Sequence, residues 1–186
     1  MRYRRAQVKG GTYFFTVVTH RREKIFNRSD NVELLRQAFK KVIKGHPFKI
    51  DAFVLLPDHL HCIWTLPRGD ADFPTRWRLI KSHFSRNCNM VGWVEARNPT
   101  RPNASRLKKK EKPIWQRRFW EHLIRNNNDL KRHIEYIHYN PVKHRMVKAP
   151  KDWQYSSFHR FASNGLYHLE WGAGVIMEFS SNLGYE

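Results

Sequence analysis

Two adjoining apolar runs, FKIDAFVLLP and HLHCIWTL, constrain the fold more than any other feature of the chain. Both are rich in β-branched and aromatic residues, and the short PDH turn at their junction lets them pair as an antiparallel β-hairpin. Alternation along the second strand places His59 and His61 on one face, opposite Leu60, Cys62 and Trp64. If helices cover the apolar face, the two imidazoles lie on the uncovered side of the sheet, where they can meet a ligand. A polar, solvated sheet face without any ligand is the alternative.

The other periodic segments indicate an α+β protein. Strands are predicted within residues 10–20 and 114–124. Helices are predicted within residues 29–47, 72–88 and 126–141. The order strand, helix, strand, strand, helix, strand, helix predicts a sandwich whose helices pack on one face of the sheet.

The chain carries far more positive than negative charge. Its 35 Lys and Arg residues against 16 Asp and Glu give a formal net charge of +19 and a pI near 10.4. Such a balance is typical of nucleic-acid-binding proteins, because neutralised phosphates release their counterions. The sequence shows no 18-residue apolar run and no secretory signal, so a cytoplasmic protein without a membrane partner is expected. Cys62 and Cys88 lack CxxC spacing, which argues against a disulfide framework and fits a reducing compartment.

A length of 186 residues suits one globular domain. We expect this domain to span residues 1–164, with a mobile basic loop at 89–112 and a C-terminal tail at 165–186. The loop is polar and without periodicity, which is typical of a solvated linker. The arginines set among aromatic residues in IWQRRFWEHLI suit a groove for phosphates and bases. Buried aromatic residues beside surface arginines explain that pattern equally well.

The helix predicted at 126–141 supplies further polar groups. With its leucine and isoleucines as the buried stripe, Tyr136 and Asn140 are neighbours at the edge of that stripe, and Tyr139 points to solvent. Pro141 is expected to close the helix and could turn Asn140 away from this line. Two imidazoles and an amide oxygen can hold a divalent cation, for which ligand softness favours Mn²⁺ or Zn²⁺ over Mg²⁺. A tyrosine beside such an ion could attack phosphorus, whereas a core-edge aromatic with a solvated hydroxyl is the alternative.

The sequence resembles the REP-associated tyrosine transposases, within the single-tyrosine HUH transposase superfamily. The matching motifs include IDAFVLLPDHLHCIWTLP, RWRLIKSHFSR, IWQRRFWEHLIR and YIHYNPVKHRMV, in family order. The resemblance implies a ferredoxin-like core with a central antiparallel sheet. It places the metal-binding pair on His59 and His61, the nucleophile on Tyr136, and a third metal ligand on Asn140, where more distant relatives commonly have Gln. It also implies a divalent metal ion, Mg²⁺ or Mn²⁺, and no small-molecule cofactor.

The same resemblance implies nicking and strand transfer of single-stranded DNA at REP-type hairpins, through a 5′-phosphotyrosine intermediate. We expect a monomer or homodimer, associated with the nucleoid, whose partner is single-stranded or hairpin DNA. The side chains expected to contact DNA are Arg2, Arg4, Arg5, Arg76, Arg78, Lys81, Arg117 and Arg118. The base that takes the Tyr136 proton stays open among water, His133 and His138. Two other functions stay open as well, a non-catalytic nucleic-acid-binding protein and a replication-initiator-type HUH nickase.

Overall fold

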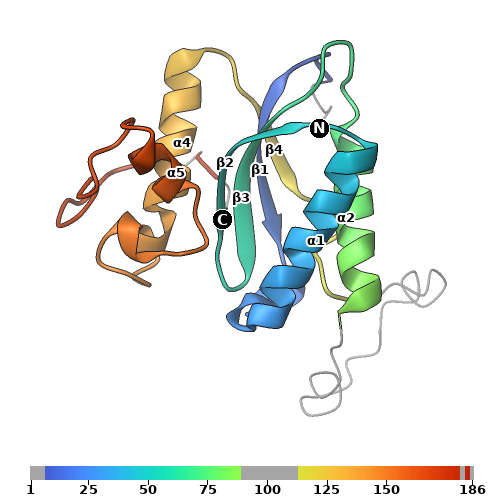
Figure 1. Cartoon of the computed structure of the whole chain (residues 1–186), viewed down its shortest axis with the longest axis horizontal. Coiled ribbons are helices and arrows are strands. Elements are labelled where there is room, and N and C mark those ends of the chain that lie inside the picture. The colour runs from blue at the N-terminus through green and yellow to red at the C-terminus, as the bar shows by residue number, and fades with distance from the viewer. Residues whose placement is uncertain (1–6, 89–112, 181–182, 185–186) are drawn as a thin grey trace.

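A computed structural model describes residues 7–88, 113–180 and 183–184, and it contains a four-stranded sheet between two layers of helices (Figure 1). The strands are β1 (Thr12–Val18), β2 (Lys49–Leu55), β3 (His59–Thr65) and β4 (Trp120–Leu123). The helices are α1 (Ser29–Gly45), α2 (Phe73–Asn87), α4 (Asn127–Lys143) and α5 (Phe158–Ser163). Short 3₁₀ turns lie at His20–Arg22, Ile25–Asn27 and Pro150–Asp152. The predicted α+β class is confirmed.

The sheet has the strand order β2-β3-β1-β4, and all its neighbouring strands are antiparallel. This order, reached through β1-α1-β2-β3-α2-β4, is that of the expected ferredoxin-like core. β2 and β3 form the predicted hairpin, with Leu55 opposite Leu60. Because β3 is an inner strand, His61 pairs with Thr16 of β1 on one side and with Val54 of β2 on the other. The strand that carries the histidines is therefore held on both edges.

α1 and α2 cover one face of this sheet, as predicted. The core on that side contains Leu60, Cys62 and Trp64, together with Phe15 and Trp77. The Trp64 and Trp77 rings stack with their centroids 4.3 Å apart. Burial of these large apolar side chains supplies the main stabilisation of the two-helix layer.

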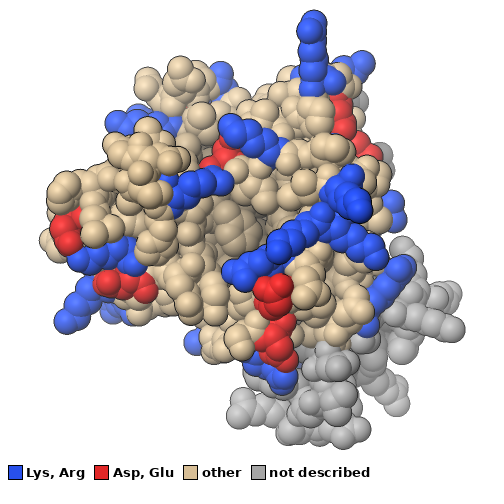
Figure 2. Space-filling view, in the orientation of Figure 1, with Lys and Arg blue, Asp and Glu red and all other residues tan. Residues whose placement is uncertain are grey.

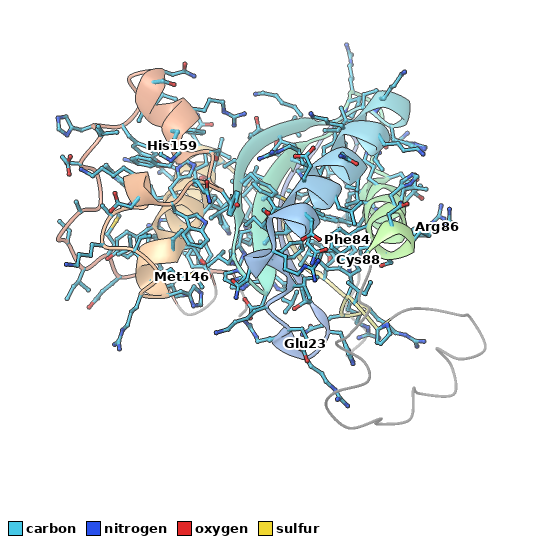
Figure 3. The ribbon with its side chains drawn as sticks, turned by 60° about the horizontal axis from the view of Figure 1, so that its bottom comes forward. Glu23, Phe84, Arg86, Cys88, Met146 and His159 are labelled. Atoms are coloured by element: carbon cyan, nitrogen blue, oxygen red, sulfur yellow. The ribbon has the colours of Figure 1, made fainter. Side chains whose placement is uncertain are left out.

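The opposite face is not uncovered, and on this point the prediction is wrong. α4 packs across β2 and β3 there, around a second core cluster that includes Phe14, Ile63 and Ile137. Figure 3 shows both layers, with Phe84 of α2 on one side of the sheet and Met146, just after α4, on the other. Apolar side chains such as Phe14, Val54 and Ile63 share this face with the histidines, so it also requires a cover, and α4 provides it.

Pro141 does not close α4, contrary to the prediction. The helix continues through Pro141 to Lys143. A proline this close to a helix end removes one backbone donor but leaves the last turn intact, and the His144 N–H donates to the Asn140 carbonyl at 3.0 Å. Asn140 therefore stays in helical register with Tyr136.

The chain after α4 packs back on that helix. The Tyr167 and Trp171 rings stack with centroids 4.6 Å apart beside α5. Tyr139, expected to point to solvent, is buried instead, because its hydroxyl donates to the Val175 carbonyl at 2.5 Å and its ring packs on Phe179. The helical phase of Tyr139 was predicted correctly, but the segment that covers it was not foreseen. A domain boundary at residue 164 stays a prediction.

Lysine and arginine side chains are spread over both helix layers of the surface (Figure 2). Exposed basic residues on α1 include Arg36, Lys40, Lys41 and Lys44. The arginines expected near the N-terminus, Arg2, Arg4 and Arg5, lie outside the described residues, as does the predicted loop at 89–112. Among the helices that the structure describes, none is long and apolar enough to cross a membrane.

Arg76 was predicted to contact DNA, but the structure places it inside the fold. Its side chain is only 3% exposed, and its guanidinium donates to the Asp70 carboxylate at 2.6 Å. The same group donates to the carbonyls of His46, Pro47 and Asp72. It thereby ties the end of α1 to the start of α2, which is a structural role. The sequence did not reveal this, because the burial depends on the turn that follows α1.

We predict that Arg76→Ala destabilises the protein and that Arg78→Ala, two residues away, does not. Loss of the buried guanidinium leaves several carbonyl groups without a donor, which costs about 2–3 kcal/mol in the free energy of unfolding. Arg78 is exposed, so its replacement should change that free energy by less than about 0.5 kcal/mol. Urea unfolding followed by circular dichroism measures both variants. Equal stability of the two variants would contradict the structural assignment of Arg76.

Candidate active site

The two histidines of β3 lie on the sheet face that α4 covers. His59 and His61 are 1% and 0% exposed, and their ring centroids are 5.0 Å apart. The prediction that they share one face is confirmed, whereas the prediction that this face is open is wrong. Burial of two imidazoles requires fixed hydrogen-bond partners, and each ring has one at Nδ1.

Asp58 and Arg22 fix the orientation of His59. The Nδ1 atom of His59 lies 2.6 Å from the Asp58 carboxylate, which also forms an ion pair with Arg22 at 3.2 Å. Burial alone would raise the pKa of the Asp58 carboxyl, but the His59 hydrogen bond and the Arg22 charge lower it overall. An ionised carboxylate only accepts hydrogen bonds, so His59 Nδ1 must be the donor. In the neutral ring the lone pair is then on Nε2.

Thr16 fixes His61 in the same tautomer. The Thr16 hydroxyl donates its one proton to the Gly184 carbonyl at 2.6 Å, and it lies 2.9 Å from His61 Nδ1. Because that proton is already used, Nδ1 of His61 donates to the hydroxyl oxygen. Both imidazoles therefore carry the Nε2 lone pair that a metal ligand needs, and both have the second partner that commonly orients such ligands.

α4 places Tyr136 and Asn140 over the two histidines. The Tyr136 ring lies 5.3 Å from His61, and the His144 ring, eight residues later, lies 5.3 Å from His59. Asn140 is fully buried, and it lies one helical turn after Tyr136 and one turn before His144. The structure thus brings Tyr136 next to His61 and keeps Asn140 on the side of α4 that carries Tyr136 and His144. Two Nε2 atoms and the Asn140 amide form a donor set that fits a divalent cation.

Among the described residues, Lys143 and Gly184 lie beside the Tyr136 hydroxyl. The Lys143 ammonium donates to the phenolic oxygen at 3.1 Å and lies 4.8 Å from the ring centroid. Gly184, with φ +97°, packs so closely that an added Cβ would lie 2.2 Å from this oxygen, so only glycine fits. A phosphate that reaches the phenol therefore requires Gly184 to move away.

The structure separates the two histidines considered as bases from the pair on β3. His138 lies against α5, where it shares a hydrogen bond of 2.8 Å with Ser157 and its ring packs on Phe161, and burial lowers its pKa to about 3. His133 lies next to Asp129, and the Phe14 ring stands between it and His61. With His122, these residues make a separate His/Asp group that could hold a metal ion. The charged group beside the Tyr136 hydroxyl is Lys143, which donates a hydrogen bond to it, and the base that takes the Tyr136 proton stays unassigned.

The remaining residues expected to contact DNA lie on the surface or near it. Arg78, Arg117 and Arg118 are exposed. The Lys81 ammonium donates to the Gln116 carbonyl at 2.9 Å and lies over the rings of Trp115 and Phe119, so it also has a packing role. The Gln116 N–H donates to the carbonyl of Val18, the β1 residue opposite His59. Arg117 and Arg118 come next in the chain after Gln116, so they lie near the end of β3 where His59 is located.

Sequence reasoning missed Asp58, Thr16 and Lys143. Asp58 had a local signal, since it precedes His59 directly at the hairpin turn. Thr16 is found only through the pairing of β1 with β3, in which it stands opposite His61. Lys143 lies two turns after Tyr136, and it could be found only once α4 was known to continue beyond Pro141.

Comparison with known proteins identifies the family of the chain. Residues 7–140 match the family described as "Transposase IS200 like". A REP-associated tyrosine transposase from Escherichia coli K12 is 45% identical over 180 residues, which cover 96% of this chain and 94% of the relative. A Haemophilus influenzae relative is 40% identical over 181 residues, covering 97% and 98% of the two chains.

A solved structure gives the same result in three dimensions. A REP-associated tyrosine transposase bound to a REP hairpin superposes with a TM-score of 0.77 at 44% identity, covering 99% of this chain and 96% of the other. These matches confirm the resemblance, the fold and the enzyme class expected from the sequence. The chain belongs to the IS200-like transposases and, within them, to the family of REP-associated tyrosine transposases.

Proposed function

We propose that this protein nicks and rejoins single-stranded DNA at REP-type hairpins, with Tyr136 as the nucleophile. The observation that carries the proposal is the placement of a buried tyrosine ring 5.3 Å from one of two histidines whose Nδ1 hydrogen bonds leave the lone pair on Nε2. A tyrosine with only a structural role at the core edge would not require two oriented histidines beside it. A DNA-binding protein without catalytic activity would not require them either.

DNA as the partner is supported by charge and by relationship. The net charge of +19 favours a polyanion, and exposed arginines stand near the end of β3 that carries His59. The solved relative that this chain resembles over nearly its whole length is bound to a REP hairpin. We therefore propose hairpin or single-stranded DNA as the substrate of this chain also.

The proposed reaction is a transesterification at one phosphodiester. The Tyr136 oxygen forms a bond to phosphorus and loses its proton, while the bond from phosphorus to the 3′ oxygen breaks and that oxygen gains a proton. The 5′ end stays on the tyrosine and the other strand ends in a 3′-OH. Attack by a 3′-OH on the phosphotyrosine reverses these steps and joins two DNA ends.

The side chains of the site divide this work between them. The Lys143 ammonium beside the phenolic oxygen stabilises the phenolate that attacks. His59, His61 and Asn140 would hold a divalent ion, Mg²⁺ or Mn²⁺, which when bound supplies positive charge to the phosphate oxygens. Asp58 keeps the His59 imidazole oriented and in the tautomer required, and the Thr16 hydroxyl orients the His61 imidazole.

Tyr136→Phe should abolish the covalent DNA adduct while DNA binding and folding persist, because the change removes one oxygen and little volume. Tyr139→Phe is the matched control. It loses a hydrogen bond to Val175, which costs about 1 kcal/mol of stability, but it should still form the adduct. Denaturing gels of protein incubated with labelled hairpin DNA measure the adduct. An adduct on the Tyr136→Phe variant would refute the assignment.

His59→Ala or His61→Ala should reduce cleavage by more than about 100-fold, with DNA affinity little changed. Asp58→Asn should raise the metal concentration needed for half-maximal cleavage by about 10–100-fold, because His59 loses its anionic partner. His168→Ala, in the exposed C-terminal segment, is the control. Metal titrations of the cleavage rate in chelator-treated protein test this, and full activity in excess EDTA would exclude a metal-dependent reaction.

Lys143→Met should move the pH profile of cleavage to higher pH, since the phenolate loses a charged donor. Lys143→Arg keeps the charge and should restore most of the activity at neutral pH. Single-turnover rates from pH 6 to about pH 10 measure the profile. If Lys143→Met lowers DNA affinity and leaves the profile in place, Lys143 is a phosphate contact and does not act on Tyr136.

A further inference from the structure

A second group of potential metal ligands lies away from the β3 histidines. His122 belongs to β4, whereas Asp129 and His133 belong to the first turns of α4. His122 pairs with Phe14 of β1, so it points to the sheet face that α4 covers. Asp129 and His133 are four residues apart and share one side of the helix. The alternation of β4 and the periodicity of α4 therefore bring these three side chains to one place.

The three side chains are close enough to bind one ion. The Asp129 carboxylate lies 2.8 Å from His122 Nε2 and 3.1 Å from His133 Nδ1. One ligand atom from each of the three lies within 4.8 Å of the other two. Two imidazoles and one carboxylate are a common ligand set for Zn²⁺, which leaves a fourth position for water. His122 and Asp129 are partly exposed, so an ion can enter from solvent.

The carboxylate is held in place by the start of α4. It accepts the Arg125 N–H at 2.9 Å, and the Asp129 N–H donates to the Asn126 side chain, which caps the helix. This anchoring resembles the second contacts that orient metal-binding carboxylates. His133 Nδ1 also donates to the main-chain carbonyl of Asp129 at 2.8 Å, so an ion bound through Nδ1 would have to displace this proton and break this hydrogen bond. Hydrogen bonds alone, from His133 to this carbonyl and between His122 and the Asp129 carboxylate, are the competing explanation.

We propose that His122, Asp129 and His133 form a second metal site of this protein, suited to Zn²⁺, which pins the N-terminal half of α4 to β4. The Phe14 ring separates it from the first site, with its centroid 4.8 Å from His133 and 5.5 Å from His61. An ion here would link the edge strand of the sheet to the helix that carries Tyr136. The proposed site is thus structural and does not depend on the reaction assigned to Tyr136.

The test uses the full-length chain with His59→Ala and His61→Ala combined, so that the first site cannot contribute. Zn²⁺ is titrated against a chromophoric chelator, and Co²⁺ is added separately to record its absorption spectrum. We expect one equivalent of Zn²⁺, a tetrahedral Co²⁺ spectrum, and a Tm raised by about 5–10 °C when Zn²⁺ is about 100 times its Kd. No DNA is present, so the result is independent of cleavage.

Two further changes in that background assign the ligands. His122→Ala, on the partly exposed edge strand, should weaken Zn²⁺ binding at least about tenfold and remove the Tm shift. Asp129→Asn keeps an acceptor for the Arg125 N–H and should weaken binding in the same way, and His168→Ala should have no effect. If the double variant binds no Zn²⁺, or if binding survives both His122→Ala and Asp129→Asn, the cluster is only a hydrogen-bonded cap.

Discussion

The burial of His59 and His61 beneath α4 is the interaction on which the rest of the site depends. An imidazole that is removed from water must have fixed partners, and here these are Asp58 for one ring and Thr16 for the other. The same partners hold both rings with the lone pair on Nε2. The hydrogen bonds that make burial of the two imidazoles tolerable therefore also set the chemistry of the site. Each ring donates from Nδ1, so its Nε2 lone pair is available to a metal ion.

The helix that buries the two histidines, α4, also carries the proposed nucleophile, Tyr136. α4 packs on Phe14 and Ile63 by its apolar stripe, and the adjacent edge of the same helix presents Tyr136 to His61. Apolar burial, which is not directional, sets how deep the helix lies, and helical periodicity sets which side chain meets the histidines. The Phe14 ring contacts two different groups of polar side chains, one at His61 and one at His133. The first group belongs to the candidate active site and the second to the His122 cluster, so a single helix would link chemistry to the edge of the sheet.

Much of the fold, and the faces on which the four candidate site residues lie, could be predicted from the sequence because both follow from local periodicity. The roles of these four residues come from the family resemblance and stay proposals. Period two placed His59 and His61 on one face, and period 3.6 placed Tyr136 beside Asn140. One failure is local, since α4 continues through Pro141 to Lys143. The other failures concern contacts between distant segments. The burial of Arg76 depends on the turn after α1, the cover over the histidine face depends on the return of α4, and the burial of Tyr139 depends on residues 171–179. No local pattern encodes such contacts, since each depends on where another segment packs.

The central claim is that α4 selects Tyr136 as the residue that joins DNA. The most direct measurement is peptide mass spectrometry of the unmodified protein after reaction with a short hairpin substrate, followed by nuclease and protease digestion. The account predicts a nucleotide phosphate on the peptide that contains Tyr136, attached through the phenolic oxygen. A phosphate on Tyr139, or on a residue outside α4, would contradict it.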